Sequence, residues 1–146
     1  MLKIAFHKKY IHSLEENHRF PMIKYELIPE QLIRENTCSH ENFFKPVVID
    51  KSIVLKTHQY EYFERLKNLK LSEKEIREIG FPLSRDLFIR EMIISQGTID
   101  CVKFSIDNGI SMNIAGGTHH AFYDRGEAFC MLNDQAIAAN YILDNK

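Results

Sequence analysis

The sequence predicts an α/β domain built on a parallel sheet, and the order of its elements carries that prediction. Short apolar runs at residues 2–6 ("LKIAF") and 111–115 ("SMNIA") favour buried strands. Apolar residues at helical spacing fill most of the chain between these runs, and an alanine-rich helical stretch ends it. Such alternation is typical of a parallel sheet that is covered by helices on both faces.

Length and composition limit the number of domains that the chain can form. The chain has 146 residues, of which 45% are hydrophobic and 27% are charged, as in ordinary globular proteins. One domain over residues 1–146 is therefore expected, without repeats or an internal linker. Sheets usually contain about four to six strands, whereas this sequence offers two or three. We therefore expect the N-terminal portion of a larger domain.

The first helical region is predicted at residues 18–36 ("HRFPMIKYELIPEQLIREN"). Proline restarts the hydrophobic register at position 29, so two short helices are expected there. The stretch 37–52 has no period and is predicted to be loop. Residues 52–55 ("SIVL") form a candidate strand.

Three further segments carry helical signals with defined ends. Residues 57–71 ("THQYEYFERLKNLKL") have the spacing of an amphipathic helix. Ser72 with Glu75 forms a capping box for a short helix that Gly80 stops. Asn133 or Asp134 is expected to cap the final helix, "QAIAANYIL".

A longer helix is predicted between Ser84, as its cap, and Gly109. Gly97 lies inside this helix. An interior glycine costs about 1 kcal/mol relative to alanine, so Gly97 predicts either a break in the helix or close packing against it.

Charge and cysteine content exclude several classes of protein. The net charge of -1 argues against general nucleic-acid binding, which requires a basic face. Met1 leads directly into "LKIAFH", so neither a secretory signal nor a membrane span is predicted. Cys38, Cys101 and Cys130 are odd in number and widely spaced, without a CxxC pair. A reducing, cytoplasmic location is therefore expected.

The candidate site is the segment 116–134, "GGTHHAFYDRGEAFCMLND". It follows a predicted strand, and open α/β sheets place their sites beyond the carboxyl ends of parallel strands. Gly116 and Gly117 allow the chain to leave the strand abruptly. His119 and His120 follow, and two imidazoles can divide the work of base and charged stabiliser at neutral pH. A purely structural histidine pair is the alternative.

Metal ligation by these residues alone is not expected. A catalytic zinc needs three protein ligands, and an adjacent histidine pair cannot readily supply them; no HExxH motif is present. Cys38 and His40 in "CSH" lack a second pair of ligands. The remaining histidines stand singly and are expected to be structural, as is Asp134, which is better explained as a helix cap.

The segment 116–134 resembles the signature loop of the zinc-dependent histone deacetylase family, including its bacterial members and acetylpolyamine amidohydrolases. The elements GG-x-HHA and FC-x-x-ND stand in the family's order. Similarity extends along nearly the whole chain, most closely to the bacterial and class IV branch, through "NHRFPMIKYELI" (17–28), "THQYEYFERL" (57–66), "IGFPLS" (79–84) and "SQGTID" (95–100).

The resemblance implies an arginase/deacetylase-like three-layer α/β fold, truncated here, and a metal-dependent hydrolase that cleaves the amide of acetyl-lysine. By position, it implies that His120 is the general base and acid, and that His119 is its electrostatic partner. Phe129 would form a wall of the tunnel that holds the acyl-lysine stem, while Gly117 would shape the tunnel floor.

One position departs from the family pattern. The family usually has glycine before its Phe-Cys pair, whereas this sequence has Ala128. A methyl group there could crowd the lip of the substrate tunnel or shift a carbonyl that contacts substrate. Cys130 is implied to pack beneath the tunnel.

Zinc is the cofactor that the resemblance implies, yet its ligands are expected to lie outside this sequence. The family takes them from an Asp-x-His pair after the next strand and from a later Asp, and its transition-state tyrosine follows later still. The present sequence ends at "YILDNK". The carboxylates that orient the histidines are expected to be absent as well.

Three hypotheses follow. In the first, the chain is part of a deacetylase for acetyl-lysine or an acetylated polyamine and becomes active when a complementing C-terminal segment joins it. In the second, it is an inactive fragment or interaction module that binds a partner, or itself, through an exposed sheet edge. In the third, it is a hydrolase or binding module that uses His119 and His120 without zinc, although no Ser or Cys nucleophile is clearly paired.

Overall fold

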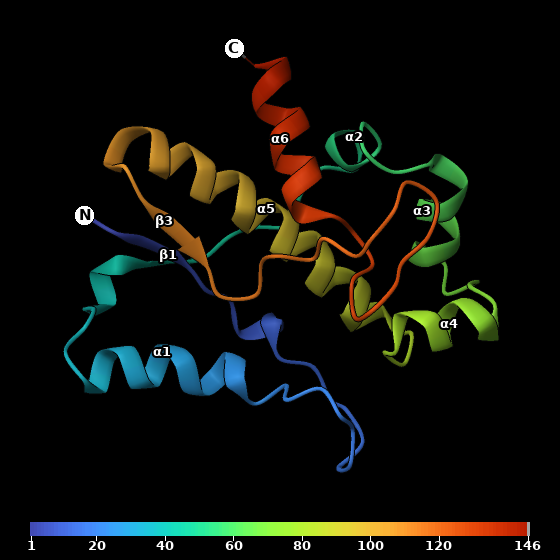
Figure 1. The fold of residues 1–146 in the computed structure, drawn as a ribbon, viewed down its shortest axis with the longest axis horizontal. Helices are drawn as coiled ribbons and strands as arrows, with labels where there is room; N and C mark the ends of the chain where they lie inside the picture. The colour runs from blue at the N-terminus through green and yellow to red at the C-terminus, as the bar shows by residue number, and fades with distance from the viewer. Residues whose placement is uncertain (146) are drawn as a thin grey trace.

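The computed structural model describes residues 1–145 and contains a small parallel sheet between helices (Figure 1). Strand β1 (Lys3–Ala5) lies in the middle, between β2 (Phe43–Phe44) and β3 (Ser111–Asn113), and pairs in parallel with both. The strands predicted at 2–6 and 111–115 are confirmed with shorter bounds. The predicted α/β class with a parallel sheet is confirmed too.

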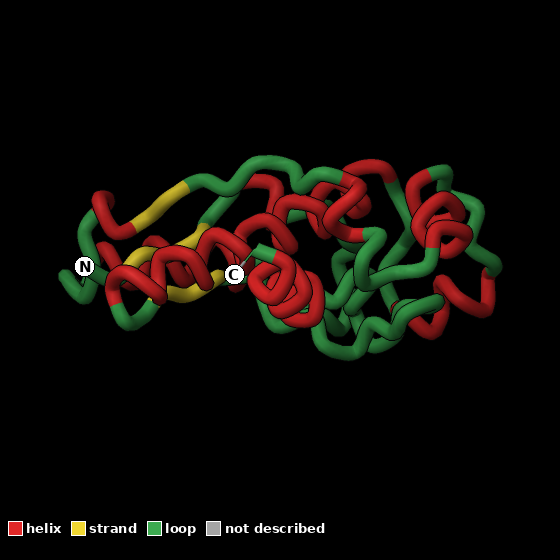
Figure 2. Tube along the Cα trace, turned by 90° about the horizontal axis from the view of Figure 1, so that it is seen from above, coloured by secondary structure: helices red, strands yellow, loops and turns green. Residues whose placement is uncertain are grey.

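Helices cover the sheet on two sides. The longest helix, α5 (Arg85–Asn108), packs on β1 and β3. Helix α1 (Lys24–Arg34) lies on the opposite side of the strands (Figure 1). Seen from above, the strands lie toward one end of an elongated molecule, and long loops fill much of the other (Figure 2). The layers match the expected three-layer arrangement.

The second strand, β2, lies within a stretch that was predicted to be loop. A short 3-10 turn at His40–Asn42 leads into it, and Ile4 aligns with Phe43 across the pair. A strand of two residues is too short for a period-2 pattern. Its hydrogen bonds come from β1, which is distant in sequence, so only the tertiary structure creates it.

The first helical region forms one helix and not two, so that prediction was wrong. Pro29 lies inside α1, and Tyr25, one turn earlier, is buried with it. A proline in a helix interior removes one backbone hydrogen bond and costs about 3 kcal/mol. Burial of the face that Tyr25 and Pro29 share opposes this cost, and the helix continues through the proline.

The candidate strand at 52–55 is also wrong, because the segment forms helix α2 (Lys51–Val54). The Asp50 side chain accepts a hydrogen bond of 2.7 Å from the Ser52 backbone N–H and caps this helix. The cap was a visible signal in the sequence. A single helical turn is too short for its apolar spacing to be distinguished from that of a strand.

The helix predicted at 57–71 is confirmed with shorter bounds, and the predicted ends of the two helices after it are confirmed. Helices α3 (Tyr60–Lys67) and α4 (Glu73–Ile79) follow each other, and the Ser72–Glu75 capping box and a left-handed Gly80 bound the second. Helix α5 starts after Ser84, whose hydroxyl accepts from the Leu87 N–H at 3.1 Å, and ends at Gly109.

Gly97 marks close packing, and α5 runs through it without a break. A Cβ atom at this position would lie 2.7 Å from the Tyr10 hydroxyl and 2.8 Å from the Asn113 side-chain nitrogen. The glycine therefore lets α5 approach the sheet and the 3-10 turn at Lys8–Tyr10.

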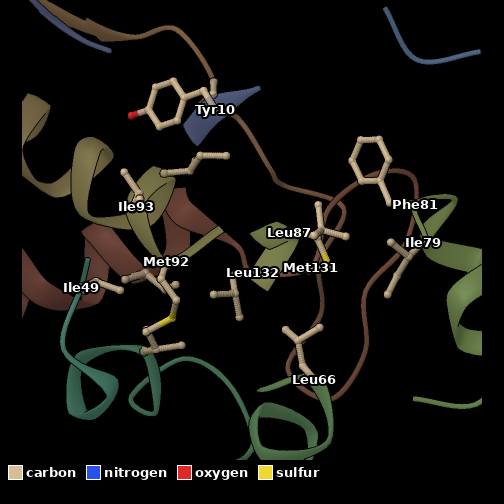
Figure 3. Close-up of a cluster of buried hydrophobic side chains, with 14 of the residues drawn as sticks. Tyr10, Ile49, Leu66, Ile79, Phe81, Leu87, Met92, Ile93, Met131 and Leu132 are labelled. Carbon is tan, nitrogen blue, oxygen red and sulfur yellow. The ribbon is translucent and has the colours of Figure 1, made fainter. Parts of the chain in front are cut away.

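The core joins α3, α4 and α5 to the end of the loop that precedes α6 (Asp134–Asp144). Figure 3 shows Met131 and Leu132 of that loop among buried side chains such as Leu66 and Leu87. Both loop residues are fully buried. The loop is therefore part of the packed interior at one end. Within residues 1–145, no helix is long and apolar enough to cross a membrane.

Candidate active-site loop

The loop 116–133 leaves the carboxyl end of β3, runs toward α3 and α4, and returns to the start of α6 (Figure 1). Gly117 has a φ of +91°, in the left-handed region that favours glycine, and a Cβ there would meet no atom within 4 Å. At Gly116, a Cβ would lie 3.0 Å from an oxygen of Asp134. The first glycine is therefore required for close approach and the second for the turn.

The turn brings the two predicted catalytic side chains side by side. The rings of His119 and His120 have centroids 4.3 Å apart and are tilted by 40°, and both residues are exposed. Nδ1 of His119 lies 2.8 Å from the Gly117 carbonyl oxygen. Because a carbonyl can only accept, Nδ1 of His119 is the donor in this contact.

Of the two residues expected to cap α6, Asn133 is confirmed, and the assignment of Asp134 as a helix cap is wrong. Asn133 is the cap, with its side chain accepting from the Ala136 N–H at 3.0 Å. The buried Asp134 carboxylate instead accepts backbone hydrogen bonds from Gly117 at 3.0 Å and Thr118 at 2.7 Å. Its side chain points back into the turn that precedes the histidine pair.

The opposite end of the loop is held by two residues that sequence reasoning did not assign to the site. The Tyr62 hydroxyl donates to the Met131 carbonyl oxygen at 2.8 Å, and Nε2 of His58 accepts from the Asn133 N–H at 2.9 Å. Burial lowers the pKa of His58, so the ring is neutral. The signal in the sequence that could have indicated them is the segment 57–66, which contains both residues and resembles the family.

Phe129 lies in an aromatic cluster near the tip of the loop. Its ring centroid is 4.9 Å from that of Phe20 and 5.0 Å from that of Phe81, and the Arg19 guanidinium lies 4.8 Å above it. Its N–H donates to the Ile79 carbonyl oxygen at 2.6 Å. Within residues 1–145, the Phe129 ring makes no ring contact with the histidine pair.

Ala128 adopts a backbone conformation that explains why its position favours glycine. Its φ is +48°, and its N–H donates to the Glu78 carbonyl oxygen at 3.0 Å. The residue is exposed, so the methyl group has room. Alanine strains the backbone here, because the left-handed region is unfavourable for an L-residue by about 1–2 kcal/mol of free energy.

Cys130 is unsuited to act as a nucleophile. Its thiol is buried, lies 3.5 Å from the Ala128 carbonyl oxygen, and is free, as are those of Cys38 and Cys101. Burial raises the pKa of Cys130 to about 11. The reactive species of a cysteine is the thiolate, and this thiol stays protonated at neutral pH.

Residues 1–145 contain no group of three or more His, Cys, Asp or Glu side chains that could hold a metal ion. His119 and His120 supply two imidazoles without a third ligand beside them. The part of the chain that the structure describes therefore does not fit a metal site by itself.

Comparison with known proteins gives consistent matches over almost the whole chain. Residues 13–146 match the model of the histone deacetylase domain. An uncharacterized protein of Picosynechococcus is 34% identical over 139 residues. The acetoin utilization protein AcuC of Staphylococcus aureus is 26% identical over 141 residues. The crystal structure of an HDAC homolog from Aquifex aeolicus superposes with a TM-score of 0.78 at 21% sequence identity.

The matched relatives are much longer than this chain. The alignment covers 95% of the chain but 46% of the Picosynechococcus protein, and 90% of the chain but 36% of AcuC. The Aquifex structure is covered over 41% of its length, with 99% of this chain aligned. The chain thus spans less than half the length of these relatives, and it shares the fold of the Aquifex structure over the part it spans.

Proposed function

The chain belongs to the histone deacetylase family, and from this membership we propose that it supplies the proton-transfer half of a zinc-dependent deacetylase site. The observation that carries the proposal is the His119–His120 pair. Its rings lie 4.3 Å apart at the carboxyl end of a parallel strand, which is where α/β enzymes gather their catalytic groups.

In this proposal His120 takes a proton from the attacking water and returns it to the leaving amine. His119 lies beside it and stabilises the charge that develops. The contact of 2.8 Å between Nδ1 of His119 and the Gly117 carbonyl oxygen supports the role of His119 as a neighbour, because it orients this ring beside His120. General acid–base catalysis of this kind contributes about 10²–10⁴-fold to a rate.

Zinc would polarise the substrate carbonyl and activate the water, but residues 1–145 do not form a site for it. We therefore propose that its ligands come from a complementing segment outside these residues. Strand β3 is an edge of the sheet, and Met112 on it is 47% exposed. An edge of this kind can pair with a further strand, so we place the junction of the two halves there.

The proposed substrate class is an acetylated amine, either acetyl-lysine in a protein or an acetylated polyamine. Phe129 would give the acyl-lysine stem an apolar wall, and Gly117 and Ala128 would shape the backbone around it. The aromatic neighbours of Phe129 support this role because they form an apolar surface beside its ring. The three free cysteines support a cytoplasmic location, where thiols stay reduced.

The exposed edge of β3 also favours a second candidate, an inactive interaction module that self-associates or binds a partner. The zinc-independent hydrolase receives less support, because burial keeps the Cys130 thiol protonated.

The test compares the 146-residue chain alone with the same chain co-expressed with any segment encoded downstream of codon 146. Zinc content and hydrolysis of an acetyl-lysine peptide and of acetylated spermidine are measured for both. We expect the chain alone to be free of zinc and inactive, and the pair to bind zinc and turn over. Stoichiometric zinc and turnover by the chain alone would contradict the two-half arrangement. An inactive, zinc-loaded pair would contradict the deacetylase function.

A further inference from the structure

The two residues that begin α6 contact the backbone on either side of the histidine pair. We propose that Asp134, together with Asn133, is a positioning residue that fixes the turn carrying His119 and His120. This inference rests on the proposed function, since it says that these contacts orient the two histidine side chains that would transfer protons. It concerns residues that the reaction itself would never touch.

Asp134 accepts from the backbone N–H groups of both residues that precede the pair. Its side chain is fully buried, with Oδ2 accepting from the Gly117 N–H at 3.0 Å and Oδ1 from the Thr118 N–H at 2.7 Å. A buried carboxylate is costly unless donors surround it, and hydrogen bonds to an ionised acceptor are stronger than neutral ones. The turn is therefore held by strong bonds to a charged group.

Further donors anchor the carboxylate to the rest of the fold. The Thr98 hydroxyl of α5 donates to Oδ2 at 2.5 Å. Its oxygen also accepts from the side-chain nitrogen of Asn113 at 2.9 Å, so the hydroxyl hydrogen is free to point at Asp134. A chain of hydrogen bonds thus joins the end of β3, the middle of α5 and the first residue of α6 to the turn.

Asn133 holds the other side of the pair. Its side-chain nitrogen donates to the carbonyl oxygen of Ala121, the residue after His120, at 3.0 Å. Its side-chain oxygen caps α6 by accepting from the Ala136 N–H at 3.0 Å. The two histidines are therefore bracketed by contacts from adjacent residues, both fixed to one helix terminus.

The contacts reach the His119 ring through a single peptide group. Asp134 accepts from the Thr118 N–H at 2.7 Å, and the Gly117 carbonyl oxygen of that same peptide group lies 2.8 Å from Nδ1 of His119. The φ of +91° at Gly117 gives this turn its shape. If the bond from Asp134 is weakened, the carbonyl loses its fixed direction, and the ring loses the contact that selects its tautomer.

A purely helical role for Asp134 does not account for these contacts. The cap of α6 is already provided by Asn133. The Asp134 side chain bonds to Gly117, Thr118 and Thr98, all outside its own helix.

The test uses the 146-residue chain labelled with 15N and compares the wild type with Asp134→Asn. The amide keeps the size of the side chain but offers one acceptor oxygen fewer to the same donors. We expect hydrogen exchange at the Gly117 and Thr118 amides to accelerate roughly tenfold, the equivalent of one lost hydrogen bond. The imidazole 15N spectrum of His119 should also lose its preference for the Nδ1–H tautomer.

Asp107→Asn makes the same chemical change at an exposed position near the end of α5 and should leave both signals unchanged. If Asp134→Asn does not fold, Thr98→Val removes one donor to the carboxylate and should accelerate exchange at Gly117 roughly threefold, whereas Thr98→Ser should not. A folded Asp134→Asn chain with wild-type exchange and wild-type His119 tautomer would overturn the proposal. No activity is measured, so the outcome is independent of whether the chain is a deacetylase.

Discussion

The Tyr62 hydroxyl donates a hydrogen bond of 2.8 Å to the Met131 carbonyl oxygen, and both residues are fully buried. This bond joins helix α3 to the end of the candidate active-site loop. Replacing Tyr62 with Phe leaves a buried carbonyl without its donor, which costs about 1–3 kcal/mol. We expect the free energy of unfolding, measured by urea denaturation, to fall by that amount.

The control for this prediction is Tyr60→Phe, which removes the same hydroxyl from a side chain that is 55% exposed. Its effect should be close to zero. Equal losses in the two variants would contradict a specific contribution of the bond to Met131.

Gly97→Ala should destabilise the protein even though alanine favours helices by about 1 kcal/mol. The new methyl would lie 2.7 Å from the Tyr10 hydroxyl, and overpacking of this kind costs about 1–3 kcal/mol. Tyr10→Phe removes that oxygen. Thermal unfolding of the double variant should therefore show a smaller loss than the sum of the two single variants, and strict additivity would argue against a direct clash.

Ala128→Gly should stabilise the protein by about 1 kcal/mol, because the φ of +48° strains alanine and not glycine. The same substitution at Ala139, an exposed residue inside α6, should cost about 1 kcal/mol. Chemical denaturation of the two variants checks the opposite signs. A loss of stability in both would show that Ala128 is not strained.

The stability of the protein should fall in acid partly because of His12. Burial lowers the pKa of His12 from 6.5 to about 4. Arg90 and His18 add to that direction, while the contact with the Ser13 carbonyl oxygen and the charge of Asp86 oppose it. The unfolded chain takes up this proton near pH 6.5 and the folded chain only near pH 4. The contribution of His12 is therefore present above pH 6.5 and is lost as the pH falls toward 4.

Glu91 has the opposite dependence: burial raises its pKa, against the opposing effect of the Arg90 guanidinium that pairs with it, so its contribution is lost as the pH rises above the usual range of a glutamate. The two effects are separated by comparing His12→Gln with the wild type. The difference in their free energies of unfolding should change with pH between about 6.5 and 4. The exposed His40→Gln should show no such change, and a constant offset for His12→Gln would rule the effect out.

If the proposed function is correct, His120→Ala in the assembled enzyme should lower kcat by about 10²–10⁴-fold with little change in KM. His119→Ala should have a smaller effect, because its role is electrostatic. Both rings are exposed in residues 1–145, so neither variant should unfold this chain. His40→Ala serves as the control, and full activity of His120→Ala would remove this residue from the mechanism.

Local signals in the sequence predicted much of the fold because their causes act over a few residues. The capping box of Ser72 and Glu75, the cap at Ser84 and the stops at Gly80 and Gly109 each depend on neighbours within one helical turn. The same holds for the histidine pair behind its two glycines. The resemblance to a known family added the expected fold, which the structure bears out.

Other features arise from contacts between residues far apart, and no local pattern could show them. Strand β2 exists because β1 pairs with it, and α1 continues through Pro29 because its face is buried. Asp134 was assigned as a helix cap by its position, yet its contact with Thr98 spans 36 residues.

The sequence by itself therefore determined where the candidate site lies and which side chains it offers, because a strand end, a glycine turn and two histidines are adjacent in the chain. Only the tertiary structure decided which residues fix the backbone of the candidate site. Asp134 bonds to the turn before the histidine pair, and Asn133 bonds to the residue after it. His58 and Tyr62 bond to the end of the loop. These groups come into contact only when the helices pack. Polar atoms that are buried by this packing must form hydrogen bonds within the protein, and their partners lie far away in the sequence.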